Sequence, residues 1–178
     1  MAIQLRKERV ADQNAISEVI IAAYKNIAYS NHREQIMVER LRNSNAFIPE
    51  LSIVAEDEHH HIAGHILLTK MHFIKEDKFY EGLALAPLSI RPEFQNKGIG
   101  KRLILESHHV AKTLGFKFIA VLGHATYYPK FGYEMTSKYN IKVPFEISAA
   151  NSMIIFLSEG DRSEVIGSSI KYSDEFFE

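Results

Sequence analysis

Apolar residues recur along this chain with two spacings, and each spacing predicts one kind of secondary structure. Between residues 16 and 27 they stand three and four positions apart, which predicts an amphipathic helix capped by Asp12. The same spacing predicts helices over residues 32–43 and 98–114, the latter ending at Gly115. Alternating or continuous apolar runs predict strands at residues 3–10, 51–56, 62–74, 79–90, 116–122 and 153–157.

The order of these elements predicts an α/β fold of the mixed-sheet, α+β kind. A short polar turn joins residues 51–56 to residues 62–68, which is typical of an antiparallel hairpin. The strand at 116–122 follows a helical crossover, so it should lie parallel to the strand before that helix. We therefore predict a single domain over 1–178, a twisted mixed sheet flanked by helices, with its core in about 1–160 and a C-terminal extension over 161–178.

Amino-acid composition and charge limit the kinds of protein and of binding partner that fit this chain. The 178 residues are 46% hydrophobic and 24% charged, as in a globular domain. A net charge of -1 without a dense basic stripe argues against nucleic acid and membrane surfaces as partners. The absence of cysteine excludes disulfides and thiolate chemistry. Neither a signal peptide nor an apolar run of roughly 20 residues is present, so we expect a cytoplasmic protein.

Three consecutive histidines, His59, His60 and His61, lie in a polar turn beside acidic residues. Neighbouring side chains of an extended segment point to opposite faces, so the three cannot share one ion unless the chain bends. We expect a solvated turn and no metal site.

The segment from residue 85 to 104 carries the candidate binding chemistry. An apolar strand leads into a turn with Gly98 and Gly100, and a helical pattern begins at that turn. Glycines let the backbone approach a ligand closely, and the first amides of a helix have no internal partner. The turn therefore predicts an anion site, and we expect the ligand to be a phosphorylated cofactor.

Two familiar phosphate motifs do not fit this turn. A P-loop requires glycine where Gln95 stands and Ser or Thr where Arg102 stands. A dinucleotide fingerprint requires a third glycine at Leu103. The pattern Gln95-x-x-Gly98-x-Gly100 instead resembles the acetyl-CoA pyrophosphate loop of the GNAT superfamily of N-acetyltransferases.

A second segment, residues 123–134, also resembles this superfamily. Its simplest interpretation is a short helix that ends at Gly132. Tyr128 stands four residues before the Gly-aromatic pair, as the family's tyrosine does, and Tyr127 is the adjacent phenol that is easily mistaken for it. The Tyr-Tyr-Pro-x-Phe-Gly form resembles the YhbS-like members, and the resemblance covers roughly residues 1–160.

The resemblance implies an acetyl-CoA-dependent N-acetyltransferase that transfers an acetyl group directly to a primary amine of a small molecule or peptide. It implies that the pantetheine arm of acetyl-CoA lies beside the strand interrupted by Pro87. The loop between the first two helices, with Tyr24 and Tyr29, would help to wall the acceptor site, although ordinary helix packing explains the same pattern. The cofactor-binding residues implied are Leu88, Ser89, Ile90, Gln95, Asn96, Lys97, Gly98, Ile99, Gly100 and Lys101.

Acyl transfer also requires an acid and a base. Tyr128 is the candidate acid, because a phenol with a pKa near 10 can protonate a departing thiolate. Some relatives place a glutamate where this chain has Ala84, so that base is missing. The base stays open among His124, our first candidate for a catalytic role, and Glu81, His72, His65 or a relayed water.

The missing glutamate motivates a second hypothesis, a noncatalytic CoA-binding or protein-interaction module of the same fold. The sequence leaves open the acceptor and the oligomeric state, for which a homodimer is one alternative.

Overall fold

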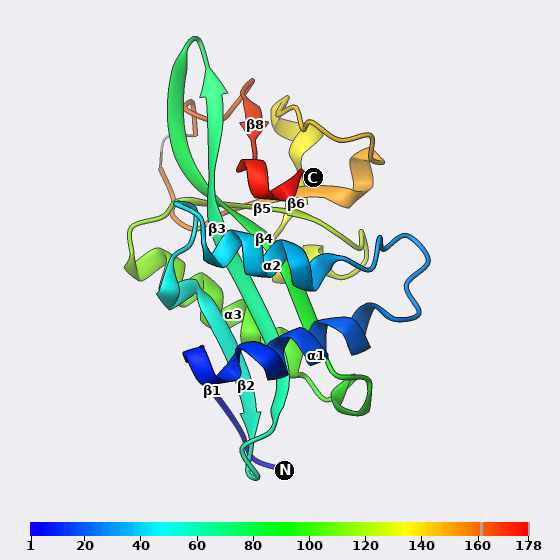
Figure 1. Ribbon diagram of the computed structural model, residues 1–178. Coiled ribbons are helices and arrows are strands. Elements are labelled where there is room, and N and C mark those ends of the chain that lie inside the picture. Colours follow the sequence, from blue (N-terminus) through cyan, green and yellow to red (C-terminus); the bar gives the residue numbers. More distant parts are fainter. Residues whose placement is uncertain (161, 178) are drawn as a thin grey trace.

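The computed structural model describes residues 1–160 and 162–177, which form a mixed β-sheet with helices on both faces (Figure 1). The strand order in the described part is β1-β2-β3-β4-β5-β7-β6, and β8 pairs with β3 beside this path. The predicted fold class is confirmed. The strands are β1 (Ile3–Lys7), β2 (Ser52–Asp57), β3 (Ile62–Lys75), β4 (Lys78–Ile90), β5 (Phe118–Leu122), β6 (Glu134–Met135), β7 (Ser152–Phe156) and β8 (Ser169–Lys171). The α-helices are α1 (Gln13–Tyr24), α2 (Glu34–Arg42) and α3 (Ile99–Thr113).

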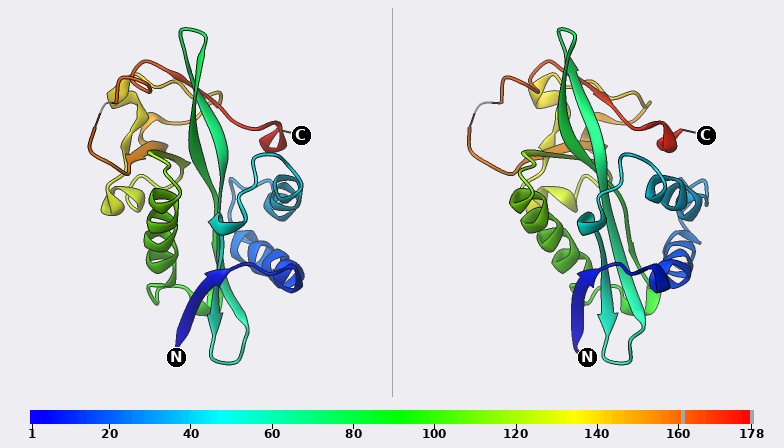
Figure 2. Two further views of the ribbon diagram at one scale, coloured as in Figure 1. Left: turned by 90° about the vertical axis from the view of Figure 1, so that its left-hand side faces the viewer. Right: turned by 60° about the vertical axis from the view of Figure 1, so that its left-hand side comes forward.

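Helices α1 and α2 cover one face of the sheet, and α3 covers the other (Figure 2). Side chains alternate between the faces along β3, as the strand period requires. Leu67 packs in the cluster that holds Ile20 of α1, whereas Ile66 and Leu68 pack in the cluster that holds Leu103 of α3. In the described chain, no helix combines the length and the apolar character needed to span a bilayer.

Strand β4 is irregular at Pro87, as the missing N–H of proline led us to expect. Its register with β3 shifts between Ile66 and Leu68, where β4 holds an extra residue. β4 pairs in parallel with β5 from Leu83 to Leu85, which confirms the direction predicted from the crossover. Beyond Leu85 no described strand pairs with β4 on the β5 side, so the two strands open there.

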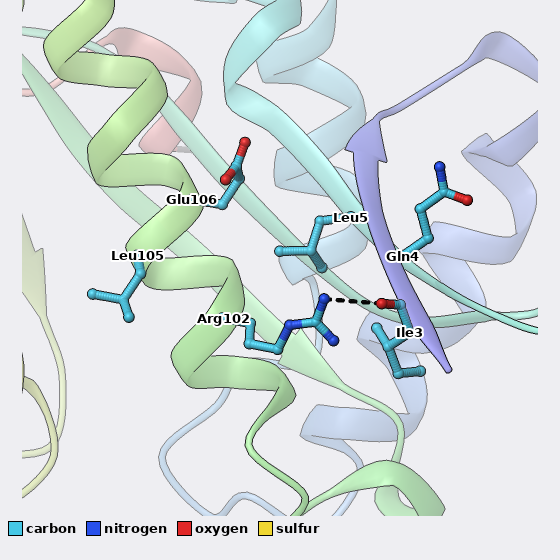
Figure 3. Close-up of a pocket in the computed structure, with 6 residues that line it drawn as sticks. All are labelled: Ile3, Gln4, Leu5, Arg102, Leu105 and Glu106. Atoms are coloured by element: carbon cyan, nitrogen blue, oxygen red, sulfur yellow. Dashed lines mark hydrogen bonds between the residues drawn. The ribbon is translucent and has the colours of Figure 1, made fainter. Parts of the chain in front are cut away.

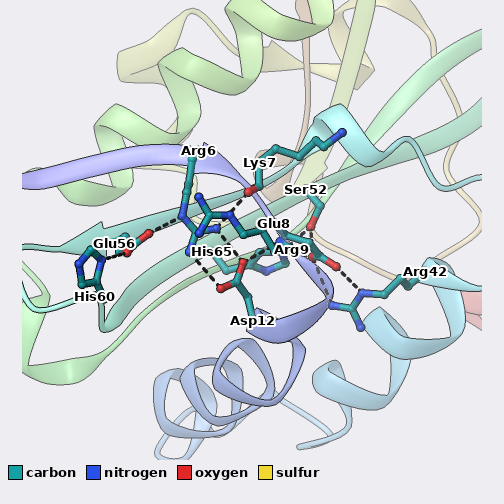
Figure 4. Close-up of polar contacts among 10 residues, drawn as sticks. All are labelled: Arg6, Lys7, Glu8, Arg9, Asp12, Arg42, Ser52, Glu56, His60 and His65. Atoms are coloured by element: carbon teal, nitrogen blue, oxygen red, sulfur yellow. Dashed lines mark hydrogen bonds and ion pairs between the residues drawn. The ribbon is translucent and has the colours of Figure 1, made fainter.

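Asp12 does not cap α1 with its side chain, contrary to our expectation. Its carboxylate accepts hydrogen bonds from the backbone N–H of Arg9 at 2.6 Å and from the Arg6 guanidinium at 2.7 Å (Figure 4). Asp12 is the last residue of the short 3-10 turn Val10–Asp12, and its carboxylate caps the start of that turn through the Arg9 N–H. The ion pair with Arg6 therefore decided where this carboxylate points.

A buried polar network fixes α2 to the sheet (Figure 4). The Glu8 carboxylate accepts hydrogen bonds from the Arg42 guanidinium at 2.6 Å and from the Ser52 hydroxyl, and His65 Nε2 lies 2.9 Å from that hydroxyl. Burial alone would raise the pKa of Glu8, but hydrogen bonds from His65, Arg42 and Ser52 lower it to about 2. Burial lowers the pKa of His65. The network thus joins β1, α2, β2 and β3.

Candidate active site

The turn before α3 has the geometry of an anion site. Asn96 has a φ of 60° and Gly98 a φ of 79°, so the backbone enters the helix through two left-handed residues. The first helical hydrogen bond runs from the Arg102 N–H to the Gly98 carbonyl at 3.2 Å, which leaves the preceding amides without helical partners. A Cβ atom at Gly98 would meet nothing within 4 Å, so the space above this turn is open.

Side chains of the same turn hold its shape. Gln95 Nε2 donates to the Ile90 carbonyl at 3.1 Å and ties the turn to the end of β4. Lys97 Nζ donates to the Glu93 carbonyl at 2.8 Å. The Ile99 side chain is buried, whereas that of Lys101 is exposed. Among the predicted cofactor contacts here, the backbone amides are therefore those best placed to face an anion.

The last residues of β4 lie at the opening between β4 and β5. Leu88 and Ile90 pack toward the α3 face, and Ser89 is buried opposite His65 of β3. The Tyr24 hydroxyl, from the end of α1, donates a long hydrogen bond of 3.5 Å to the Leu88 carbonyl. Burial raises the pKa of Tyr24 to about 12. One side of the opening is thus formed by the backbone of β4, with the protonated Tyr24 hydroxyl beside it.

Tyr128 begins the short 3-10 turn Tyr128–Phe131 that follows β5. Its ring lies against Gly123, where a side chain would clash with it, and edge-on to Tyr133 at 5.5 Å. Burial, and then the nearby phenols of Tyr24, Tyr127 and Tyr29, raise the pKa of Tyr128 above its usual value. Its hydroxyl is therefore protonated at neutral pH.

Tyr127 reaches a different place from its neighbour. Its hydroxyl lies 2.8 Å from the position a Cβ atom would take on Gly100, in the first turn of α3. The Leu88 and Ile90 side chains are 3.9 Å from the same point. The adjacent phenols thus make different contacts, Tyr127 with the first turn of α3 and Tyr128 with Gly123 and Tyr133.

His124 meets the loop between α1 and α2. Its Nε2 lies 3.1 Å from the Tyr29 hydroxyl, and the two rings are edge-on with centroids 6.0 Å apart. Both side chains are exposed. This contact joins the segment after β5 to residues almost a hundred positions earlier, which no local sequence pattern indicates.

The other candidates for a base lie elsewhere. His65 is fully buried in the Glu8 network. His72 and Glu81 face each other on the β3–β4 ladder, and Glu81 stands seven residues before Leu88, roughly 20 Å along the strand. Ala84 is buried and carries no ionisable group. Of the predicted bases, His124 is the one that the fold brings to the opening.

Two surface hollows lie away from the opening between β4 and β5. One of about 590 Å³ lies between β1 and α3, where Arg102 donates to the Ile3 carbonyl at 2.9 Å (Figure 3). The other, of about 500 Å³, lies where β3 and β4 meet the C-terminal segment, and His72 and Glu81 line it. Neither hollow includes Tyr128, His124 or the turn before α3.

The histidine turn holds local ion pairs. His60 contacts the Glu56 carboxylate, and His61 Nδ1 lies 3.3 Å from Asp57 Oδ2. Within residues 1–160 and 162–177, no group of three His, Asp or Glu side chains is arranged to hold a metal ion.

A family model described as the acetyltransferase (GNAT) domain matches residues 49–135, which include the turn before α3 and both adjacent tyrosines. The chain belongs to the GNAT family. Among curated proteins, this GNAT chain resembles the uncharacterized N-acetyltransferase YjhQ of Escherichia coli K12, with 37% identity over 107 residues. Those residues are 60% of this chain and 59% of YjhQ, so the match spans less than two thirds of that relative.

Solved GNAT structures share the whole fold. A GNAT family acetyltransferase from Brucella melitensis, in complex with acetyl-CoA, has 26% identity and a TM-score of 0.80, with 98% of each chain covered. The GNAT family N-acetyltransferase YhbS from Escherichia coli, in complex with CoA, has 17% identity and a TM-score of 0.84. The match covers 98% of this chain and 91% of the YhbS chain. At 17% identity the likeness supports the fold alone.

Proposed function

We propose that this GNAT protein is an acetyl-CoA-dependent N-acetyltransferase that transfers an acetyl group directly to a primary amine of a small molecule or peptide. The observation that carries the proposal is the end of β4–β5 pairing at Leu85 and Val121. Because the strands are parallel, the anion-binding turn after β4 and Tyr128 after β5 lie at the same edge of the sheet. The Brucella melitensis relative, which binds acetyl-CoA and matches over the whole chain, supports the same ligand.

The residues at this edge suit acetyl-CoA. The amides that begin α3 and the open space above Gly98 would hold the diphosphate. The backbone of Leu88, Ser89 and Ile90, which no described strand pairs with on the β5 side, would bind the pantetheine arm, and an amide of this stretch would stabilise the oxyanion of the transition state. When bound, acetyl-CoA supplies the thioester carbon that the amine attacks.

Two side chains would move protons. The Tyr128 hydroxyl, protonated at neutral pH, would donate to the departing thiolate. His124, exposed at the mouth of the opening, would accept the proton of the amine, directly or through water. Positioning both substrates contributes most of the remaining rate acceleration, roughly 7 to 11 kcal/mol in favourable intramolecular cases.

Binding is tested by thermal unfolding with acetyl-CoA, since a ligand specific for the folded state raises the melting temperature. Gly98→Asp should abolish this shift because a carboxylate would occupy the diphosphate site. Gly115→Asp is the matched control. Gly115 also has a left-handed φ, 89°, and open space around it, but it follows the far end of α3. No shift with the unmodified protein would refute the proposal.

Activity is tested by CoA release and by mass-detected acetylation of an amine and peptide library. The buried Ala84, in place of a glutamate, favours the alternative of a noncatalytic CoA-binding or protein-interaction module. Tight acetyl-CoA binding without CoA release from any amine would decide for that module.

We also propose a cytoplasmic location, because acetyl-CoA is a metabolite of the cell interior. Fractionation of cells that express the protein, followed by immunoblotting, tests this location.

A further inference from the structure

An unpaired carboxylate oxygen lies at the start of α2. Glu34 is the first residue of this helix, and its Oε1 accepts a hydrogen bond from the Ser30 hydroxyl. Its Oε2 is buried and has no hydrogen-bond partner among the described residues. A buried acceptor without a donor destabilises a fold, so a ligand that supplies the donor would explain why it is kept.

The contacts of the α1–α2 loop, residues 25–33, bring this carboxylate to the proposed active site. Tyr24, just before the loop, contacts the Leu88 carbonyl on β4. Tyr29, next to Ser30, contacts His124 after β5. The loop therefore lies across both sides of the opening. Together with the larger effect of burial, the charge of Glu34 raises the pKa of Tyr24, which agrees with a short separation.

The groups around this loop suit a cation. The Glu34 side chain is partly buried, and its shielded Oε2 would form a strong charge-assisted hydrogen bond with an ammonium group. Tyr24 and Tyr29, just before and within this loop, are aromatic side chains of the kind whose faces stabilise a cation. The Tyr29–His124 contact is exposed, so it can open to admit a ligand with little loss of buried apolar surface.

We propose that Glu34 Oε2 binds a second cationic group of the acceptor, so that the acceptor class is a diamine, a polyamine or a peptide with two amino groups. The inference rests on the proposed function, since it concerns the acceptor of that reaction. The attacking amine must be neutral, whereas a carboxylate partner favours the protonated form. Glu34 therefore holds the nitrogen that does not react.

The test is titration calorimetry of the CoA-bound protein with putrescine, a diamine, and with n-butylamine, which has the same carbon chain and one amine. We expect putrescine to bind about tenfold or more tightly than n-butylamine. Glu34→Gln should remove this preference, and Glu34→Asp should retain part of it. Glu39→Gln is the matched control, because Glu39 is on the same helix and exposed.

Equal affinities of the unmodified protein for the two amines, or an unchanged preference in Glu34→Gln, would overturn the inference. A Glu34-dependent preference for putrescine supports it. CoA release with the same two amines is measured separately and tests the proposed function. A preference for putrescine, without CoA release from these amines or from any amine of the library, would refute the transferase and leave the cation site standing. CoA release without a preference would support the transferase and overturn the cation site.

Discussion

The hydroxyl of Tyr127 lies 2.8 Å from the point where residue 100 would carry a Cβ atom. Gly100 is helical, with no left-handed φ, so its backbone alone does not require glycine. Glycine is required by lack of space, because the Tyr127 hydroxyl occupies the place where a side chain would begin. The glycine at position 100 is thus specified by a tyrosine that lies 27 positions later in the sequence.

This relationship predicts that the effect of Gly100→Ala on stability changes sign when the Tyr127 hydroxyl is removed. Gly100→Ala should destabilise the protein by up to about 1 kcal/mol, since overpacking exceeds the gain in helix propensity. In the Tyr127→Phe background, where the hydroxyl is absent, the same change should stabilise by up to about 1 kcal/mol. Urea unfolding of the four proteins measures the coupling. Additive effects would show that the hydroxyl moves away without cost.

Tyr128→Phe keeps the ring and its packing but removes the proton. We expect turnover to fall by about 10²- to 10⁴-fold with acetyl-CoA affinity retained, as for loss of a general acid. Tyr133→Phe is the control from the same aromatic cluster. Its hydroxyl contacts His108 at 2.9 Å, so this change should lower stability and leave turnover unaltered. Wild-type turnover of Tyr128→Phe in a chemistry-limited assay would end its assignment as the acid.

His124→Ala should lower turnover by about 10²- to 10⁴-fold with acetyl-CoA affinity retained, as for loss of a general base. His124→Asn separates this role from a structural one. Asparagine can still bond the Tyr29 hydroxyl but cannot accept the proton of the amine, so both variants should lose turnover. Full activity in His124→Asn, with loss in His124→Ala, would mean that the histidine only positions the loop.

Acid should destabilise the protein through the network of Glu8 and His65. The folded-state pKa of Glu8 is about 2 against an ordinary 4.5, so its contribution is complete above pH 4.5 and is lost as the pH falls toward 2. The lowered pKa of His65 acts in the same direction, below its ordinary value of 6.5.

Glu8→Gln should therefore lower the free energy of unfolding by about 3 kcal/mol at pH 7, because it leaves Arg42 buried without its carboxylate. The difference from the unmodified protein should shrink as the pH falls from 4.5 toward 2. Urea unfolding at several pH values measures it, with Glu39→Gln on the exposed face of α2 as the control. A difference that stays constant with pH would contradict the pKa of Glu8.

Local spacing was sufficient to predict the helices, the parallel β4–β5 pair and the irregularity at Pro87. Each depends on period, turn chemistry or a missing N–H within a few residues. The same is true of the glycine turn and of the position of Tyr128 before Gly132. The sequence by itself therefore determined the α-helices, most of the strands with their order, and the resemblance to the family, although the first strand ends at Lys7 and not at Val10 as predicted.

Tertiary structure decided which side chains meet. Tyr127 and Tyr128 are neighbours with the same chemistry, and only packing sends one to Gly100 and the other against Gly123. Glu34 has the pattern of an ordinary acidic residue in a first helical turn. β8 has three residues and pairs with the far part of β3, so its stability comes from a distant partner. Such contacts depend on register and packing between segments far apart in sequence, which local spacing does not encode.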